Sequence, residues 1–268
     1  MQQDPSQLRF ATTQLTPGPR MPYAEQGDPT GEAIIFLHGY SDSWFSFSRV
    51  FLLLSPAYHA FAFHQRGHGD SDKPECCYTV DDLAVDVDAF MDAVGINEAT
   101  IVGHSGGTLI APRVALSYPQ CVSRLVLIGA AIMGANNETM LGLGEEVRAL
   151  EDPIPSEFAR EFQVSTIHHP VPGEFLSAAV SASLKLPTHV WRDYMEGVIL
   201  TPDHAARLGE INAPTLIMWG EQDAVFPREE QDRLASTIPD ATLRVYPATG
   251  HAVHWEPPSR SSGMWRRS

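Results

Sequence analysis

The sequence Gly-His-Ser-Gly-Gly at 103–107 places a serine between glycines, directly after the apolar run Thr100–Val102. A serine hydroxyl is a weak nucleophile at its free pKa, so catalysis requires a tight strand-to-helix turn that exposes it to a base. Glycine on both sides lets two backbone segments pass close together. The alternative is an ordinary glycine-rich turn, and this motif alone does not decide between the two. Ser105 is therefore a candidate nucleophile that needs partners elsewhere in the chain.

A carboxylate and an imidazole follow Ser105 in the order that such chemistry needs. Asp223 comes just after the apolar run 215–219, and His251 comes just after the run 241–246. Open parallel sheets place their sites beyond the carboxyl ends of the strands, where all three side chains would meet. We predict that Ser105 is the nucleophile, that His251 is the general base, and that Asp223 orients the imidazole and stabilises its charged form.

With these motifs in this order, and His38-Gly39 after the apolar run 33–37, the chain resembles the α/β-hydrolase family with a helical cap inserted in its core. The resemblance covers residues 20–257. The family pattern matches 248–251 and the following Glu256-Pro257, which favours His251 over the nearby His254 as the base. Serine at position 105 argues against the dehalogenase and epoxide hydrolase branches, which use aspartate there.

The same machinery needs two donors for the oxyanion of a tetrahedral intermediate. The backbone N–H groups of Tyr40 and Gly106 are the predicted oxyanion hole. Three further residues are candidates for the substrate pocket, and for each of them core packing is the alternative: Trp44, His104 and Trp191. His104 stands beside the serine, and we interpret it as a buried, hydrogen-bonded histidine rather than as the base.

Alternating strand and helix signals predict an α/β fold, with a mostly parallel sheet and helices on both faces. Thr79 and Gly95 mark the start and the end of a scaffold helix over 80–94. The alternation stops after residue 132, where prolines divide helical stretches that carry scattered aromatic residues. We therefore expect a hydrolase core over 1–132 and 209–268, and a helical cap over 133–208. The predicted strands are Arg20 to Glu25, Ala33 to Leu37, His59 to Phe63, Thr100 to Val102, Arg124 to Ile128, Thr215 to Trp219 and Thr242 to Tyr246.

Composition narrows the partners of this 268-residue chain. Its 33 acidic and 18 basic side chains give a net charge of −15, which would repel nucleic acid and anionic membrane surfaces. The polar start Met1–Pro5 has no leader pattern, and the sequence contains no run of membrane-span length, so we expect a cytoplasmic protein. Three cysteines form no disulfide framework, and their spacing and that of the histidines predict neither a metal site nor a cofactor.

The segment 258–268 lacks apolar periodicity and concentrates positive charge, whereas the family normally ends in an amphipathic helix. We hypothesise a frameshift or an altered terminus there.

The predicted function is hydrolysis of a small, uncharged carboxylic ester or lactone through an acyl-enzyme, without a cofactor. A C–C bond hydrolase, an amidase or a cofactor-free perhydrolase would use the same three residues. A ligand receptor on a hydrolase scaffold, with slow turnover, and an inactive structural homologue are the alternatives outside these enzyme classes. The sequence leaves the oligomeric state open.

Overall fold

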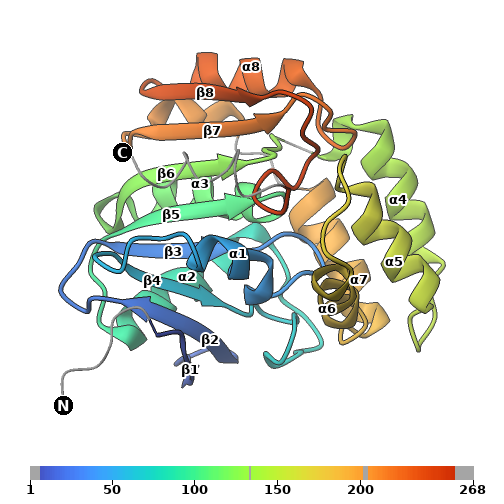
Figure 1. Ribbon diagram of the computed structural model, residues 1–268, viewed down its shortest axis with the longest axis horizontal. Coiled ribbons are helices and arrows are strands. Elements are labelled where there is room, and N and C mark those ends of the chain that lie inside the picture. Colours follow the sequence, from blue (N-terminus) through green and yellow to red (C-terminus); the bar gives the residue numbers. More distant parts are fainter. Residues whose placement is uncertain (1–6, 133, 202–204, 257–268) are drawn as a thin grey trace.

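The computed structural model describes residues 7–132, 134–201 and 205–256, and within them the chain forms an eight-stranded sheet (Figure 1). The strand order is β1-β2-β4-β3-β5-β6-β7-β8. Pairing is antiparallel for β1 with β2 and for β2 with β4, and parallel across the rest of the sheet. The predicted fold class is confirmed. The strands are Arg9–Gln14 (β1), Arg20–Gly27 (β2), Ala33–Leu37 (β3), His59–Phe63 (β4), Ala99–His104 (β5), Val122–Ile128 (β6), Thr215–Gly220 (β7) and Ala241–Tyr246 (β8).

The central strands form because their side chains are apolar on both faces of the sheet. All five residues of β3 are buried, and so are all five of β4. Ile35 packs on one face of the sheet with helices α2 (Val80–Val94) and α3 (Gly107–Ser117). Phe36 packs on the other face, beneath helix α1 (Ser48–Phe51). Continuous apolar runs of this kind are typical of parallel strands that are covered on both sides.

Two details of the core bear on the sequence predictions. Thr79 and Asp82 form a capping box at the start of α2, and Gly95 ends that helix in a left-handed conformation with φ 76°, as predicted.

Strand β1 was not predicted, because most of its side chains are exposed. It pairs along the edge of the sheet with β2 and lacks the apolar run that marked the other strands.

Between β6 and β7 the described residues form helices and loops, and we call this stretch, 134–201 and 205–210, the cap. Figure 1 shows its helices gathered beyond the arrowheads of β5 and β6. A proline directly precedes each of α5, α6 and α7, where its fixed φ suits a helix start. The cap elements are η3 (Gly134–Asn136), α4 (Glu138–Arg148), α5 (Ser156–Ser165), α6 (Gly173–Ser183), α7 (Thr188–Tyr194), the π-helical η4 (Met195–Leu200) and η5 (Ala205–Glu210); α8 (Arg228–Thr237) then joins β7 to β8.

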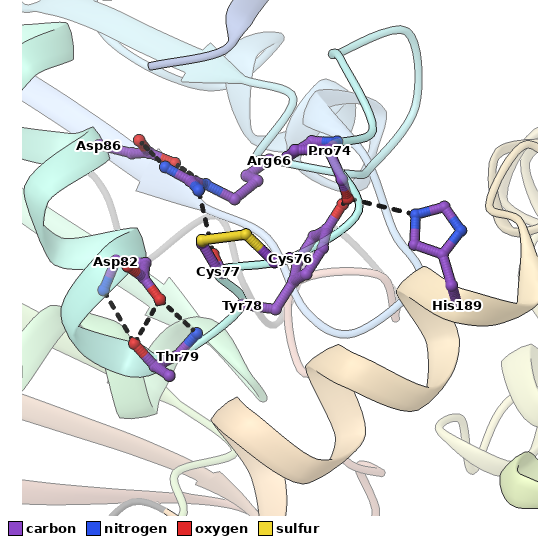
Figure 2. The surroundings of a disulfide bond; sticks show 9 residues. All are labelled: Arg66, Pro74, Cys76, Cys77, Tyr78, Thr79, Asp82, Asp86 and His189. Carbon is purple, nitrogen blue, oxygen red and sulfur yellow. Dashed lines mark hydrogen bonds and ion pairs between the residues drawn. A yellow bond between two sulfur atoms is a disulfide. The ribbon is translucent and has the colours of Figure 1, made fainter. Parts of the chain in front are cut away.

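One cysteine interpretation needs correction. Cys76 and Cys77 are joined by a disulfide, whereas Cys121 is free (Figure 2). A disulfide between adjacent residues joins no two elements of the fold. It is therefore not the kind of disulfide that a framework of spaced cysteines predicts. The carbonyl of Cys77 accepts a hydrogen bond from Arg66, whose guanidinium also pairs with Asp86 at 2.8 Å.

Within the described ranges, no helix has the length and apolar character needed to cross a membrane. The unusual segment 258–268, with its hypothesised frameshift, lies outside the residues that the structure describes.

Candidate active site

Ser105 occupies a sharp turn between β5 and α3, with φ at 50°. A non-glycine residue enters this left-handed region only when its surroundings hold it there. A Cβ on Gly103 would lie 2.4 Å from the carbonyl oxygen of Gly107, and one on Gly107 would lie 2.3 Å from that of Leu37. Both glycines are therefore required by close backbone approach. The amide of Ser105 donates to the Ile128 carbonyl at 3.0 Å, which ties the turn to β6.

The loops after β7 and β8 bring Asp223 and His251 together. The Nδ1 of His251 lies 2.9 Å from Asp223 Oδ2, and the two side chains are 1% and 0% exposed. The other carboxylate oxygen of Asp223 accepts the backbone N–H groups of Val225, at 2.8 Å, and Phe226, at 3.0 Å. Because Oδ1 is held by two amides, Oδ2 remains directed at the imidazole. This arrangement fixes the ring so that Nε2 faces away from the carboxylate.

Ser105 and His251 line the same cavity, which has a volume of about 340 Å³. The Nε2 of His251 is buried and makes no hydrogen bond to the described residues, so the serine-to-histidine hydrogen bond is not formed in this structure. Such bonds are often long in unliganded enzymes and shorten when substrate binds. Asp223 borders a neighbouring hollow of about 490 Å³ that shares Glu138, Thr139 and Val225 with the first.

The predicted oxyanion donors flank this cavity. Tyr40 belongs to its lining, and Gly106 follows Ser105 directly. Among the described residues, neither amide N–H has a hydrogen-bond acceptor. The Tyr40 hydroxyl donates to the carbonyl of Trp191 at 2.6 Å, and its ring stacks on Tyr194 with centroids 5.4 Å apart. Both amides are therefore free of competing acceptors in the described chain, as their predicted role as oxyanion donors requires.

Comparison with known proteins identifies the family of the chain. Residues 32–258 match the family model described as alpha/beta hydrolase fold. The chain belongs to this family. It is 30% identical over 264 residues to a 2-hydroxy-6-oxononadienedioate/2-hydroxy-6-oxononatrienedioate hydrolase from Burkholderia vietnamiensis, covering 91% of this chain and 89% of the relative. It is 27% identical over 261 residues to a non-heme chloroperoxidase from Streptomyces lividans, covering 91% and 94%. Among solved structures, an esterase from Exiguobacterium antarcticum superposes with a TM-score of 0.85 at 22% identity, covering 96% of this chain and 97% of that one.

The walls of the cavity in this hydrolase come mainly from the cap. Helix α4 contributes Glu138, Gly142 and Glu146, which are spaced four residues apart and share one face of the helix. The other wall residues of α4 and α5, with the nearby loops, are Thr139, Met140, Leu143, Phe158, Glu161, Phe162, Ser165, Thr166, Ile199, Val225 and Phe226. The sequence analysis missed these residues. Their helical spacing was a usable signal, but the opposite faces of both helices also carry apolar residues.

The three candidate pocket residues lie elsewhere among the described residues. Trp191 is 0% exposed and packs against Tyr40 and Phe158. Trp44 is half-buried, with its ring in edge contact with Phe10 at 5.1 Å. Both tryptophan side chains therefore pack against the core, which was the alternative to a place in the substrate pocket.

His104 is also absent from the described lining of the cavity. Its ring lies behind His251, with centroids 5.1 Å apart. It is buried as expected, but its Nδ1 lies 3.8 Å from Asp42 Oδ2, too far for a hydrogen bond. Burial lowers the pKa of His104 well below its ordinary value.

A buried polar cluster next to the loop after β3, which carries Tyr40, was not predicted. Burial raises the pKa of Asp42 to about 7, and its carboxyl accepts hydrogen bonds from Gln163, at 3.0 Å, and Ser46, at 3.2 Å. Gln163 belongs to α5, and it also donates to Ser183 of α6 at 2.8 Å. The cluster therefore joins the loop that carries Tyr40 to the cap. Nothing in the local sequence distinguishes Asp42 from an exposed loop acid.

In the part of the chain that the structure describes, no group of three or more His, Cys, Asp or Glu side chains is placed to hold a metal ion.

Proposed function

We propose that this alpha/beta hydrolase cleaves carboxylic esters or lactones through an acyl-enzyme formed on Ser105. The Ser105 hydroxyl attacks the ester carbonyl while His251 Nε2 takes its proton, and the oxyanion is held by the N–H groups of Tyr40 and Gly106. His251 returns the proton to the departing alkoxide. Water, deprotonated by the same Nε2, then attacks the acyl-enzyme and releases the acid, and Ser105 regains its proton. The observation that carries the proposal is the Asp223-oriented imidazole sharing one cavity with the strained serine.

The charge of the cavity supports an ester rather than the substrate in the name of the Burkholderia vietnamiensis relative. A dienedioate carries two carboxylates, and its binding calls for basic side chains. The described lining contains three glutamates and neither lysine nor arginine. An anionic substrate would therefore meet like charge and find no partner for its carboxylates. An ester without negative charge fits this lining better, and the apolar side chains of Phe162 and Phe226 suit its acyl part.

The proposal is tested with p-nitrophenyl esters of graded acyl length. We expect steady turnover that Ser105→Ala abolishes, while Ser177→Ala, an exposed serine of α6, serves as the matched control. A single burst of nitrophenol without turnover would favour the receptor alternative. A second comparison uses p-nitrophenyl butyrate and the similarly sized p-nitrophenyl hemisuccinate, whose acyl group is anionic. Equal kcat/KM for these two esters would contradict the charge argument.

A further inference from the structure

The mouth of the proposed active-site cavity carries three exposed glutamates, which we call the glutamate rim: Glu138, Glu146 and Glu161. Glu138 and Glu146 lie on one face of α4, two turns apart, and Glu161 lies on α5. Figure 1 shows both α4 and α5 among the cap helices, beyond the arrowheads of the central strands. The rim therefore approaches the cavity from two helices.

The negative charge of the rim is not neutralised within the described chain. None of the three glutamates forms an ion pair there. Arg148, at the end of α4, pairs instead with Glu196 at 2.6 Å. Arg160 precedes Glu161 on α5 but does not belong to the lining of the cavity. The described lining of the cavity therefore carries three carboxylates and neither lysine nor arginine, while Arg233 lines the neighbouring hollow that shares Glu138.

A second observation shows which end of the cavity reacts. His251 is 1% exposed, lines the cavity, and has a buried Nε2 without a hydrogen-bond partner in the described chain. This nitrogen marks the reacting end, next to Ser105. Apolar side chains such as Ile199 and Phe226 line the space around it, whereas the charged lining residues are the exposed glutamates. The two ends of the cavity thus differ in chemistry. The end at His251 is suited to the ester carbonyl, and the mouth carries negative charge.

We propose that the preferred esters carry a cationic ammonium group on the part that extends toward α4 and α5. The inference rests on the proposed function, and it replaces the uncharged substrate that the sequence led us to expect by one with a positive charge. Because the glutamates are exposed, water weakens each attraction, and three of them together give about a tenfold preference in kcat/KM over a neutral ester of the same shape. Screening lowers that preference to about twofold at about 1 M salt.

The test compares choline butyrate with 3,3-dimethylbutyl butyrate, which replaces the quaternary nitrogen by carbon and keeps its shape. Hydrolysis of both is followed in a pH-stat at low and high salt. We expect the kcat/KM ratio of about ten to fall nearly to one in the triple variant Glu138→Gln, Glu146→Gln and Glu161→Gln. The matched control changes three exposed glutamates outside the cavity and shifts the net charge equally: Glu145→Gln, Glu151→Gln and Glu157→Gln. The control should keep the ratio of the unaltered protein.

A ratio near one in the unaltered protein at low salt would overturn the inference, and so would an equal loss of preference in the control variant. Turnover of p-nitrophenyl butyrate is measured in parallel, so that an active enzyme without cation preference refutes only this inference. Titration calorimetry of Ser105→Ala with the two esters gives the same comparison without turnover. If no ester is hydrolysed, the proposed function fails, and the calorimetric preference still decides whether the rim selects cations.

Discussion

Lowering the pH from about 7.5 to about 5 should destabilise this protein, because five buried histidines are held neutral in the folded chain. Burial lowers the pKa of His64 and His68 to about 4 and that of His254 to about 3. It also lowers the pKa of His38 and His104 well below the ordinary value of 6.5. The unfolded chain therefore binds more protons than the folded chain between about pH 4 and pH 6.5. Stability contributed by these groups is present above pH 6.5 and is lost as the pH falls through this window.

The size of the effect follows from the pKa values of His64, His68 and His254. At about pH 5, protonation of a histidine in the unfolded chain favours unfolding by about 2 kcal/mol, so His64, His68 and His254 together give about 6 kcal/mol. Asp42 acts in the opposite direction, because burial raises its pKa to about 7 and acidification relieves the cost of its charge. That relief is about 2 kcal/mol. The net loss from these four groups is about 4 kcal/mol, and His38 and His104 act in the same direction as the other histidines. It is a large part of the 5 to 15 kcal/mol that is typical of a folded domain.

Urea unfolding followed by tryptophan fluorescence measures this loss directly. The free energy of unfolding should decline steadily from about pH 7 to about pH 5, above the range where most carboxylates titrate. His254→Gln should reduce the slope in this window, whereas the exposed His168→Gln should leave it unchanged. A free energy of unfolding that stays level or rises on acidification would refute the reasoning. An equal change of slope in both variants would also count against the buried histidines as its source.

Three substitutions test other parts of the structure. Asp223→Asn should lower kcat by about 10⁴ because it leaves the imidazole in the wrong tautomer, and near-normal kcat would remove Asp223 from the mechanism. Gly103→Ala should abolish esterase activity and lower the thermal midpoint, because its Cβ would lie 2.4 Å from the Gly107 carbonyl oxygen; full activity would show that the turn can open. Gln163→Leu should cost about 1 to 3 kcal/mol in urea unfolding by leaving Asp42 short of a donor, and unaltered stability would show that the cluster is not needed.

The sheet could be predicted from sequence because its strands are continuous apolar runs. In β3 and β4 every residue is buried, so the pattern is unambiguous. The edge strand β1 is mostly exposed, and its pairing with β2 depends on a partner that no local pattern identifies. Local sequence pattern thus predicts the covered strands and also the edge strand β8, but it fails at the edge strand β1, where long-range pairing decides.

For the candidate site, chain order was more informative than residue type. Ser105, Asp223 and His251 each follow a strand, and the rule that parallel sheets bring such loops together places them correctly as a group. The cavity walls follow no such rule. Trp191 was a pocket candidate because it is an aromatic residue of the predicted cap, but it is completely buried. Which face of a cap helix meets substrate depends on how the cap sits on the sheet, and that information is not local.

Two hydrogen bonds connect the cap to the loop that carries Tyr40, the candidate oxyanion donor. Tyr40 lines the same cavity as Ser105, and its hydroxyl donates a hydrogen bond to the carbonyl of Trp191 on α7. Two residues further along the same loop, Asp42 accepts a hydrogen bond from Gln163 of α5, and α5 also forms a wall of the cavity. A displacement of the cap would therefore move the loop that carries the Tyr40 amide. Because an oxyanion donor is effective only over a narrow range of distances, we expect any movement of the cap on substrate binding to change the alignment of the proposed donor through these two hydrogen bonds.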